Sequence, residues 1–286
     1  MAFKAAICPN CGGNLQVPDD RASVKCMYCG TDIIVRQAIQ AGSGVNIDNY
    51  LKLAVTANKA GNYQEAYNYY SKVLEYDINN PEGWFGKARA AGWMSTFPDF
   101  RDSEIISGFQ NSLDNIDEKK RRALQVQCAA EIHRLSMAYF NLIYENVTSY
   151  GSDDDVWITY LNRCGSLISL MEFGHSLDPN NQELMHGIID ICNTNLGGIK
   201  YEYGVTYSNA YGVVGHGTED AVRRVTADGQ QYFTNKKNLF TNKLKALNPD
   251  FKPPEVKKEY STQEIACICC ILIIVLIVIA SMLGKH

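Results

Sequence analysis

Four cysteines near the N-terminus form two CxxC pairs, Cys8 with Cys11 and Cys26 with Cys29. Each pair can present two thiolates from one tight turn. Four thiolates complete a tetrahedral shell around Zn²⁺, which leaves no position for a substrate or a water molecule. We therefore expect a structural metal site with all four cysteines as ligands. An iron site and a redox-active CxxC dithiol are the alternatives.

Short strand-like segments surround these pairs. Residues 14–17 and 23–25 alternate between apolar and polar side chains, and a third such segment follows at 32–35. A segment this short buries too little apolar surface to fold alone, so metal binding, about 10 to 16 kcal/mol in comparable peptides, would supply most of its stability. Over residues 5–36 the sequence resembles the zinc-ribbon family in its CPxCG knuckle form. The resemblance implies that the four cysteines match the family's four ligands, and that the metal is structural Zn²⁺.

The charge of the chain argues against nucleic acid as a partner. The 286 residues carry a formal net charge of −4. The ribbon segment has four basic and three acidic residues, which makes a poor phosphate-binding surface. A basic run at 119–122 is predicted to be a solvated helix face, with a localisation signal or a nucleic-acid patch as the alternative. The charged ribbon residues are Lys4, Arg21, Lys25 and Arg36 with Asp19, Asp20 and Asp32.

The other six cysteines form two groups. Three lie among apolar helical residues, where we expect small core hydrophobes. Three lie at the start of an apolar C-terminal segment and fit lipid acylation, although cysteine is also apolar enough to be an ordinary residue of such a helix. The first group is Cys128, Cys164 and Cys192, and the second is Cys267, Cys269 and Cys270.

The histidines form no catalytic arrangement. There is no HExxH sequence, and no histidine stands at motif spacing from a nucleophile. We therefore predict no catalytic residue and do not expect an enzyme.

An internal repeat begins at residue 46 and extends to 95. Trp84 and Ala88 follow Tyr50 and Ala54 at an interval of 34 residues. This region resembles a tetratricopeptide repeat, which implies stacked helical hairpins with a groove for a protein or peptide ligand. The residues at the spacing of that family's packing positions are Tyr50, Leu53, Ala54, Gly61, Tyr63, Ala66 and Tyr70.

The rest of the body reads as helical but irregular. Helices are predicted over 117–150, 153–176 and 218–247, which gives three to four helical hairpins. The segment 200–217 breaks this pattern and is predicted to be a tyrosine-rich surface loop or a small hairpin. The predicted fold class is mainly α, a tetratricopeptide-like solenoid with a small N-terminal β zinc ribbon and a C-terminal transmembrane helix.

The transmembrane prediction comes from an uninterrupted apolar run over 265–283. At about 1.5 Å per residue, such a run covers nearly 30 Å, the thickness of the hydrocarbon layer. A core helix is the alternative. Because the N-terminus lacks a secretory signal, we expect a single-pass tail anchor with the N-terminal body in the cytoplasm. Lys252, Lys257 and Lys258 agree with the positive-inside tendency.

Together these features predict a membrane-tethered protein–protein interaction adaptor or scaffold. The alternatives are a self-assembling, membrane-associated structural subunit, which would be a homo-oligomer, and a membrane-held nucleic-acid-binding regulator. The predicted organisation is a zinc ribbon at 1–38, a linker at 39–45, the helical-repeat domain at 46–248, a juxtamembrane linker at 249–264 and the membrane helix at 265–283.

Overall fold

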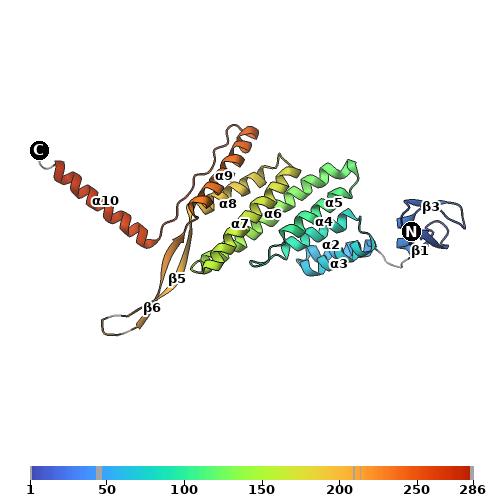
Figure 1. Ribbon diagram of the computed structural model, residues 1–286, viewed down its shortest axis with the longest axis horizontal. Coiled ribbons are helices and arrows are strands. Elements are labelled where there is room, and N and C mark those ends of the chain that lie inside the picture. The colour runs from blue at the N-terminus through green and yellow to red at the C-terminus, as the bar shows by residue number, and fades with distance from the viewer. Residues whose placement is uncertain (1, 43–46, 209, 213, 284–286) are drawn as a thin grey trace. The chain divides into compact units, whose positions relative to one another are not determined.

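The computed structural model describes residues 2–42, 47–208, 210–212 and 214–283, with the side chains at 40, 42 and 278–283 left outside the description (Figure 1). The described part of the chain is mainly helical, as predicted from its periodicity, with three antiparallel β hairpins. Its contacts divide it into two compact units, which are described separately. The first comprises Met1–Met94 and Ser103–Arg121, and the second comprises Ser95–Asp102 and Arg122–His286.

The first unit contains four short strands and then a series of helices. Its elements are β1 (Phe3–Ile7), β2 (Asn14–Pro18), β3 (Ser23–Lys25), β4 (Asp32–Ile34), α1 (Val35–Gly42), α2 (Ile47–Lys59), α3 (Tyr63–Tyr76), α4 (Pro81–Trp93) and α5 (Asp102–Asp114).

The strands form two antiparallel hairpins, β1 with β2 and β3 with β4. Each hairpin turns through one CxxC pair. Gly12 (φ +73°) and Gly30 (φ +72°) follow the second cysteine of each pair in the left-handed region, where glycine carries no Cβ penalty. The hairpin core is small and consists of Ala6, Cys8, Leu15, Val17, Cys26, Ile33, Val35 and Ala38.

The helices α2, α3 and α4 pack in sequence, and α2 also contacts α4. Ala54 on α2 and Ala66 on α3 are fully buried, so small side chains let these helices approach each other closely. The buried ring of Tyr70 lies over Gly86 of α4, where an added Cβ would be 2.1 Å from the Tyr70 Cζ atom. The close contact of α3 with α4 therefore requires glycine at position 86.

The second unit contains longer helices and one hairpin. Its elements are most of α6 (Glu118–Tyr150), then α7 (Asp154–Leu177), α8 (Gln182–Gly197), β5 (Ile199–Ser208), β6 (Val214–Arg223), α9 (Ala227–Leu247) and α10 (Thr262–Leu283). Side chains cap α7, α8 and α9 at their N-termini. Asp153, Asn181 and Thr226 accept backbone N–H groups of α7, α8 and α9.

The β5–β6 hairpin is longer than the loop or small hairpin predicted at 200–217. Its ladder pairs Ile199 with Arg223 at the base and Ser208 with Val214 at the far end, and residues 209 and 213 lie outside the described set. Because β6 runs to Arg223, the helix predicted from 218 begins only at Ala227. Figure 1 shows the hairpin extending away from the helices of its unit.

The prediction of a transmembrane helix at 265–283, and with it the single-pass anchor on a cytoplasmic body, is wrong. No helix in the described part of the chain is both long enough and apolar enough to cross a bilayer.

The two segments predicted to be linkers, 39–45 and 249–264, are partly helical or contact the rest of their unit. Helix α1 runs through the first part of the segment 39–45, and residues 43–45 lie outside the described set. The segment 249–264 has no helix or strand until α10 begins at Thr262, yet it makes specific contacts with its own unit, which are treated below.

Candidate metal centre

The four predicted ligand cysteines lie together at the turns of the two N-terminal hairpins. All four sulfur atoms lie within 4.8 Å of one another. Two contacts join cysteines of different pairs, with Cys8 Sγ 3.8 Å from Cys29 Sγ and Cys11 Sγ 3.8 Å from Cys26 Sγ. The two pairs therefore form one cluster that could bind a metal ion.

The two knuckles have the same backbone hydrogen bonds. The N–H of Gly12 donates to the carbonyl of Cys8 at 2.8 Å, and the N–H of Gly30 donates to the carbonyl of Cys26 at 2.9 Å. In each knuckle the first cysteine is buried and the second is exposed. Each turn thus presents one buried and one exposed thiol, and together the four thiols make up the cluster.

Two polar side chains that the sequence reading did not single out contact the outer thiol of the second knuckle. Asn10 Nδ2 lies 3.7 Å from Cys29 Sγ, and Thr31 Oγ1 lies 3.4 Å from it. Asn10 also donates to Thr31 Oγ1 at 3.0 Å, so the two side chains hold each other in place. The hydroxyl and the backbone N–H of Thr31, followed by Asn10, lower the pKa of the Cys29 thiol to about 5.

In the first knuckle, the pKa of one thiol is lowered and the pKa of the other is raised. Burial raises the pKa of Cys8, but hydrogen bonds from the backbone N–H groups of Cys11 and Asn10 lower it by more. The backbone N–H of Gly13 lowers the pKa of Cys11, while burial and the three neighbouring thiols raise it by more, to about 12. Four sulfurs this close cannot all ionise without a cation, because each thiolate repels the next.

The donor set fits a tetrahedral metal ion. Metal–sulfur bonds of about 2.3 Å in a regular tetrahedron place the ligand sulfurs about 3.8 Å apart. Two sulfur–sulfur distances in the cluster, Cys8 to Cys29 and Cys11 to Cys26, are 3.8 Å. A bound cation would also remove the repulsion among four thiolates, and four protein ligands would fill its shell.

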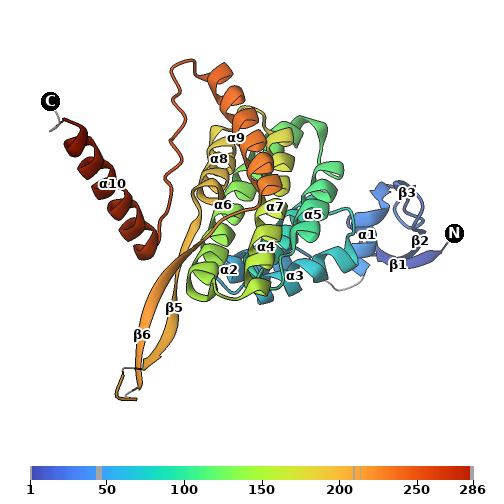
Figure 2. The same cartoon turned by 60° about the vertical axis from the view of Figure 1, so that its left-hand side comes forward.

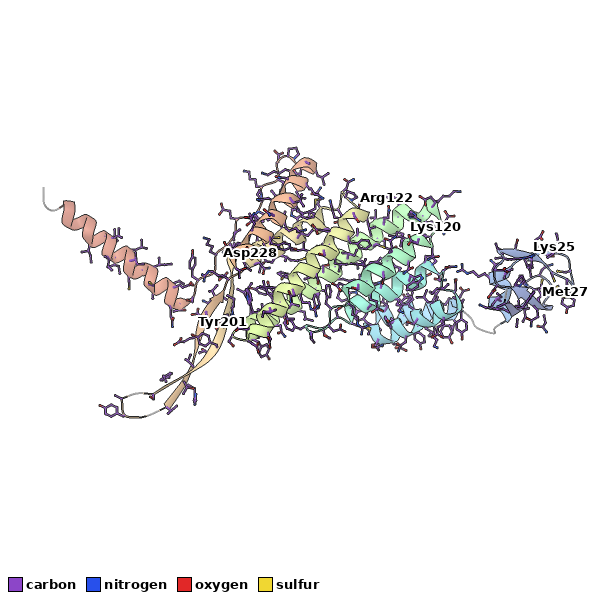
Figure 3. All side chains as sticks on the ribbon, in the orientation of Figure 1. Lys25, Met27, Lys120, Arg122, Tyr201 and Asp228 are labelled. Atoms are coloured by element: carbon purple, nitrogen blue, oxygen red, sulfur yellow. The ribbon has the colours of Figure 1, made fainter. Side chains whose placement is uncertain are left out.

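The surface of the centre carries balanced charges and an exposed apolar side chain. Lys25 Nζ lies 3.1 Å from the Asp32 carboxylate, and Lys4 Nζ lies 3.8 Å from that of Asp19. Two of the basic side chains of this N-terminal segment are thus paired with acids. Figure 3 labels Lys25 and Met27 on this surface, and the Met27 side chain is 77 % exposed.

The remaining cysteines lie apart from this cluster. Cys128, Cys164 and Cys192 are fully buried, as expected of small core hydrophobes, and burial raises the pKa of each to about 12. The three cysteines of α10 are exposed, and their acylation stays a prediction. All ten thiols of the chain are free.

The centre is a four-cysteine cluster on two equivalent turns, of the kind that can hold a metal ion. The chain matches no protein family and no curated protein. What can be concluded about the centre therefore comes from its own geometry and chemistry.

Proposed function

We propose that this protein is a non-enzymatic protein–protein interaction adaptor, with a structural Zn²⁺ centre in a zinc ribbon and tetratricopeptide-like helical hairpins that bind a protein or peptide. The observation that carries the proposal is the cluster of four cysteine sulfurs, which could supply all four ligands of a metal ion. Zn²⁺ with four protein ligands stabilises a fold but has no open position for a substrate. Among the alternatives, a redox dithiol needs only two sulfurs, whereas all four lie within 4.8 Å of one another. A four-thiolate iron site has the same geometry as a zinc site, so identification of the bound metal separates the two.

The stability of the small hairpin core supports the same role for the metal. Eight buried residues make up this core, and two of them are the ligands Cys8 and Cys26. So small a core supplies little stabilisation, whereas a structural zinc site contributes about 10 to 16 kcal/mol in comparable peptides. The metal would thus hold both hairpins in the geometry that presents their surface to a partner.

The helices α2, α3 and α4 support the interaction role. Their consecutive packing and the contact of α2 with α4 agree with stacked helical hairpins. On α4, Lys87 Nζ lies 4.9 Å from the centre of the Tyr67 ring and 5.9 Å from that of Trp84. Half-buried aromatic rings beside a cation are typical of protein-binding surfaces.

Metal content tests the structural centre. Native mass spectrometry of the full chain should show one zinc ion per chain. A Cys26→Ser/Cys29→Ser variant should bind none, and a Cys267→Ser variant, which removes an exposed thiol outside the cluster, should bind one. Zinc retained at full occupancy in the double variant would contradict the assigned ligands.

Site-specific cross-linking tests the adaptor role. A photoreactive residue at Lys87 should cross-link a discrete protein in cells. The matched control is Lys72 on α3, an exposed lysine paired with Glu75, where no such product should form. Equal cross-linking at both positions would contradict a specific surface on α4. Turnover of a small molecule by the purified chain, independent of metal, would contradict the non-enzymatic role.

A further inference from the structure

The segment 249–261, here called the strap, connects α9 to α10 without forming a helix or a strand. Figure 2 shows its extended course between these helices. It belongs to the second unit, and its partners come from α8, from α9 and from the end of β6. The sequence predicts a juxtamembrane linker over 249–264, and the structure shows that this segment makes contacts with the body of its unit.

The strap is held through its backbone. The N–H of Glu259 donates to the carbonyl of Gly197 at 2.9 Å. The Arg224 guanidinium donates to the carbonyl of Glu259 at 2.9 Å, and Lys237 Nζ lies 3.4 Å from the carbonyl of Pro254. Contacts to main-chain groups are the usual way in which a protein holds an extended peptide, since they do not depend on its side chains.

The side chains of the strap divide by polarity. Phe251, Pro253 and Val256 are half-buried, and the Phe251 ring meets the His186 ring of α8 edge-on at 5.2 Å. The strap therefore places apolar residues on the body with the spacing F-x-P-x-x-V and keeps its charges in solvent. The exposed charged residues are Asp250, Lys252, Glu255, Lys257, Lys258 and Glu259.

Gly197, the last residue of α8, lies so close to the strap that a side chain at this position would not fit. A Cβ added there would lie 2.2 Å from the carbonyl oxygen of Lys257, a backbone atom that can move only if the strap moves. Hollows remain beside the strap, one of about 320 Å³ bordered by Tyr144 and Asp190 and one of about 400 Å³ bordered by Arg224. The strap thus lies in a groove that it does not fill.

We propose that this groove, formed by α8 and the adjoining parts of β6 and α9, is a binding site for extended peptides with F-x-P-x-x-V spacing, which the chain's own strap occupies. A partner segment of that chemistry would compete with the strap. A tethered ligand acts at an effective concentration in the millimolar range, so the strap would weaken the binding of any partner until it is displaced. This inference goes beyond the adaptor proposal, because it depends neither on the metal nor on α2 to α4.

Two glycine substitutions in the full chain test whether the strap occupies the groove as described. Gly197→Ala should displace the strap, whereas Gly204→Ala on β5 adds a Cβ with nothing within 4 Å. Hydrogen exchange of the Glu259 amide should accelerate at least tenfold in Gly197→Ala and stay unchanged in Gly204→Ala. An unchanged Glu259 amide in Gly197→Ala would overturn the proposed seating of the strap.

A peptide measurement tests the groove itself and does not depend on Gly197→Ala folding. Phe251→Asp/Val256→Asp in the full chain should release the strap and leave the groove intact. A fluorescent peptide of residues 249–261 should bind this variant at least tenfold more tightly than wild type, and a scrambled peptide should bind neither protein. Equal affinity for variant and wild type, or no binding to the variant, would overturn the proposal.

Discussion

Ser261 and Glu264 cap the start of α10 reciprocally. The N–H of Glu264 donates to Ser261 Oγ at 3.1 Å, and the N–H of Ser261 donates to Glu264 Oε2 at 2.8 Å. This capping box satisfies two backbone donors at the helix start. The same Glu264 carboxylate pairs with Arg224 Nη1 at 2.9 Å, and this partner is the main reason that the pKa of Glu264 lies below its ordinary value.

Removing the Ser261 hydroxyl should loosen the first turn of α10. Loss of a serine N-cap costs typically about 1 kcal/mol, which is about fivefold in a local opening equilibrium. The Glu264 amide should therefore exchange about fivefold faster in Ser261→Ala. Ser176→Ala is the control, because that hydroxyl donates to a carbonyl within α7 and caps no N-terminus. No change at Glu264 would show that the cap is not formed in solution.

Asp220 should remain ionised in unusually acidic solution. Lys200 Nζ lies 2.5 Å from its carboxylate, and the backbone N–H and hydroxyl of Thr262 donate to it at 2.9 and 3.0 Å. The Lys200 contact, followed by Thr262, lowers the pKa of Asp220 to about 2.

Because this pKa is lower in the folded than in the unfolded chain, the carboxylate stabilises the fold above about pH 4, and that contribution is lost as the pH falls toward 2. Carboxyl ¹³C NMR should give a midpoint near 2 for Asp220, and Lys200→Met should raise it. A midpoint near 3.9 in wild type would contradict the ion pair.

Two glycine-to-alanine substitutions in helices should change stability in opposite directions. Gly86→Ala on α4 places a methyl group against the buried Tyr70 ring and should lower the free energy of unfolding by about 1 to 3 kcal/mol, despite the better helix propensity of alanine. Gly165→Ala on α7 meets nothing within 4 Å and should raise it by up to about 1 kcal/mol. Denaturant unfolding of both variants checks the signs, and a stabilised Gly86→Ala would contradict the packing of α3 on α4.

Alkylation of the zinc-loaded chain should separate the ten cysteines into three classes. The exposed cysteines of α10 should react, and the three buried ones should not, because burial suppresses their thiolate form. The four ligands should be protected until a chelator removes the metal, after which they should react as well. Mass spectrometry of the modified peptides shows in which order the cysteines react. Reaction of the four ligands before chelation would contradict a metal-filled cluster. The α10 cysteines are Cys267, Cys269 and Cys270.

The four-cysteine cluster could be predicted from sequence because its information is local. A CxxC turn places two sulfurs close together through the geometry of four consecutive residues, and only the meeting of the two turns requires the fold. The contacts of Cys29 with Asn10 and Thr31 were not predicted, since Asn10 belongs to the opposite knuckle and its approach depends on how the hairpins pack.

The structure differs from the sequence predictions at residues 218–226, where a helix was expected, and in α10, where a membrane span was expected. The helix expected from 218 does not begin there, because β6 continues to Arg223. The Arg223 guanidinium donates to the carbonyls of Gly151 and Ser152, which lie between α6 and α7. In α10, composition alone favoured a membrane helix, and the described part of the helix does not meet the length and apolarity required.

By itself the sequence determined the features that depend on neighbouring residues: the paired cysteine turns and the small residues that pack α2 on α3. Only the tertiary structure decided the approach of Cys8 Sγ to Cys29 Sγ, the length of β5 and β6, and the docking of the strap on Gly197. These arise from contacts between residues far apart in the chain, and their free energy depends on how closely two surfaces approach, which no local pattern records.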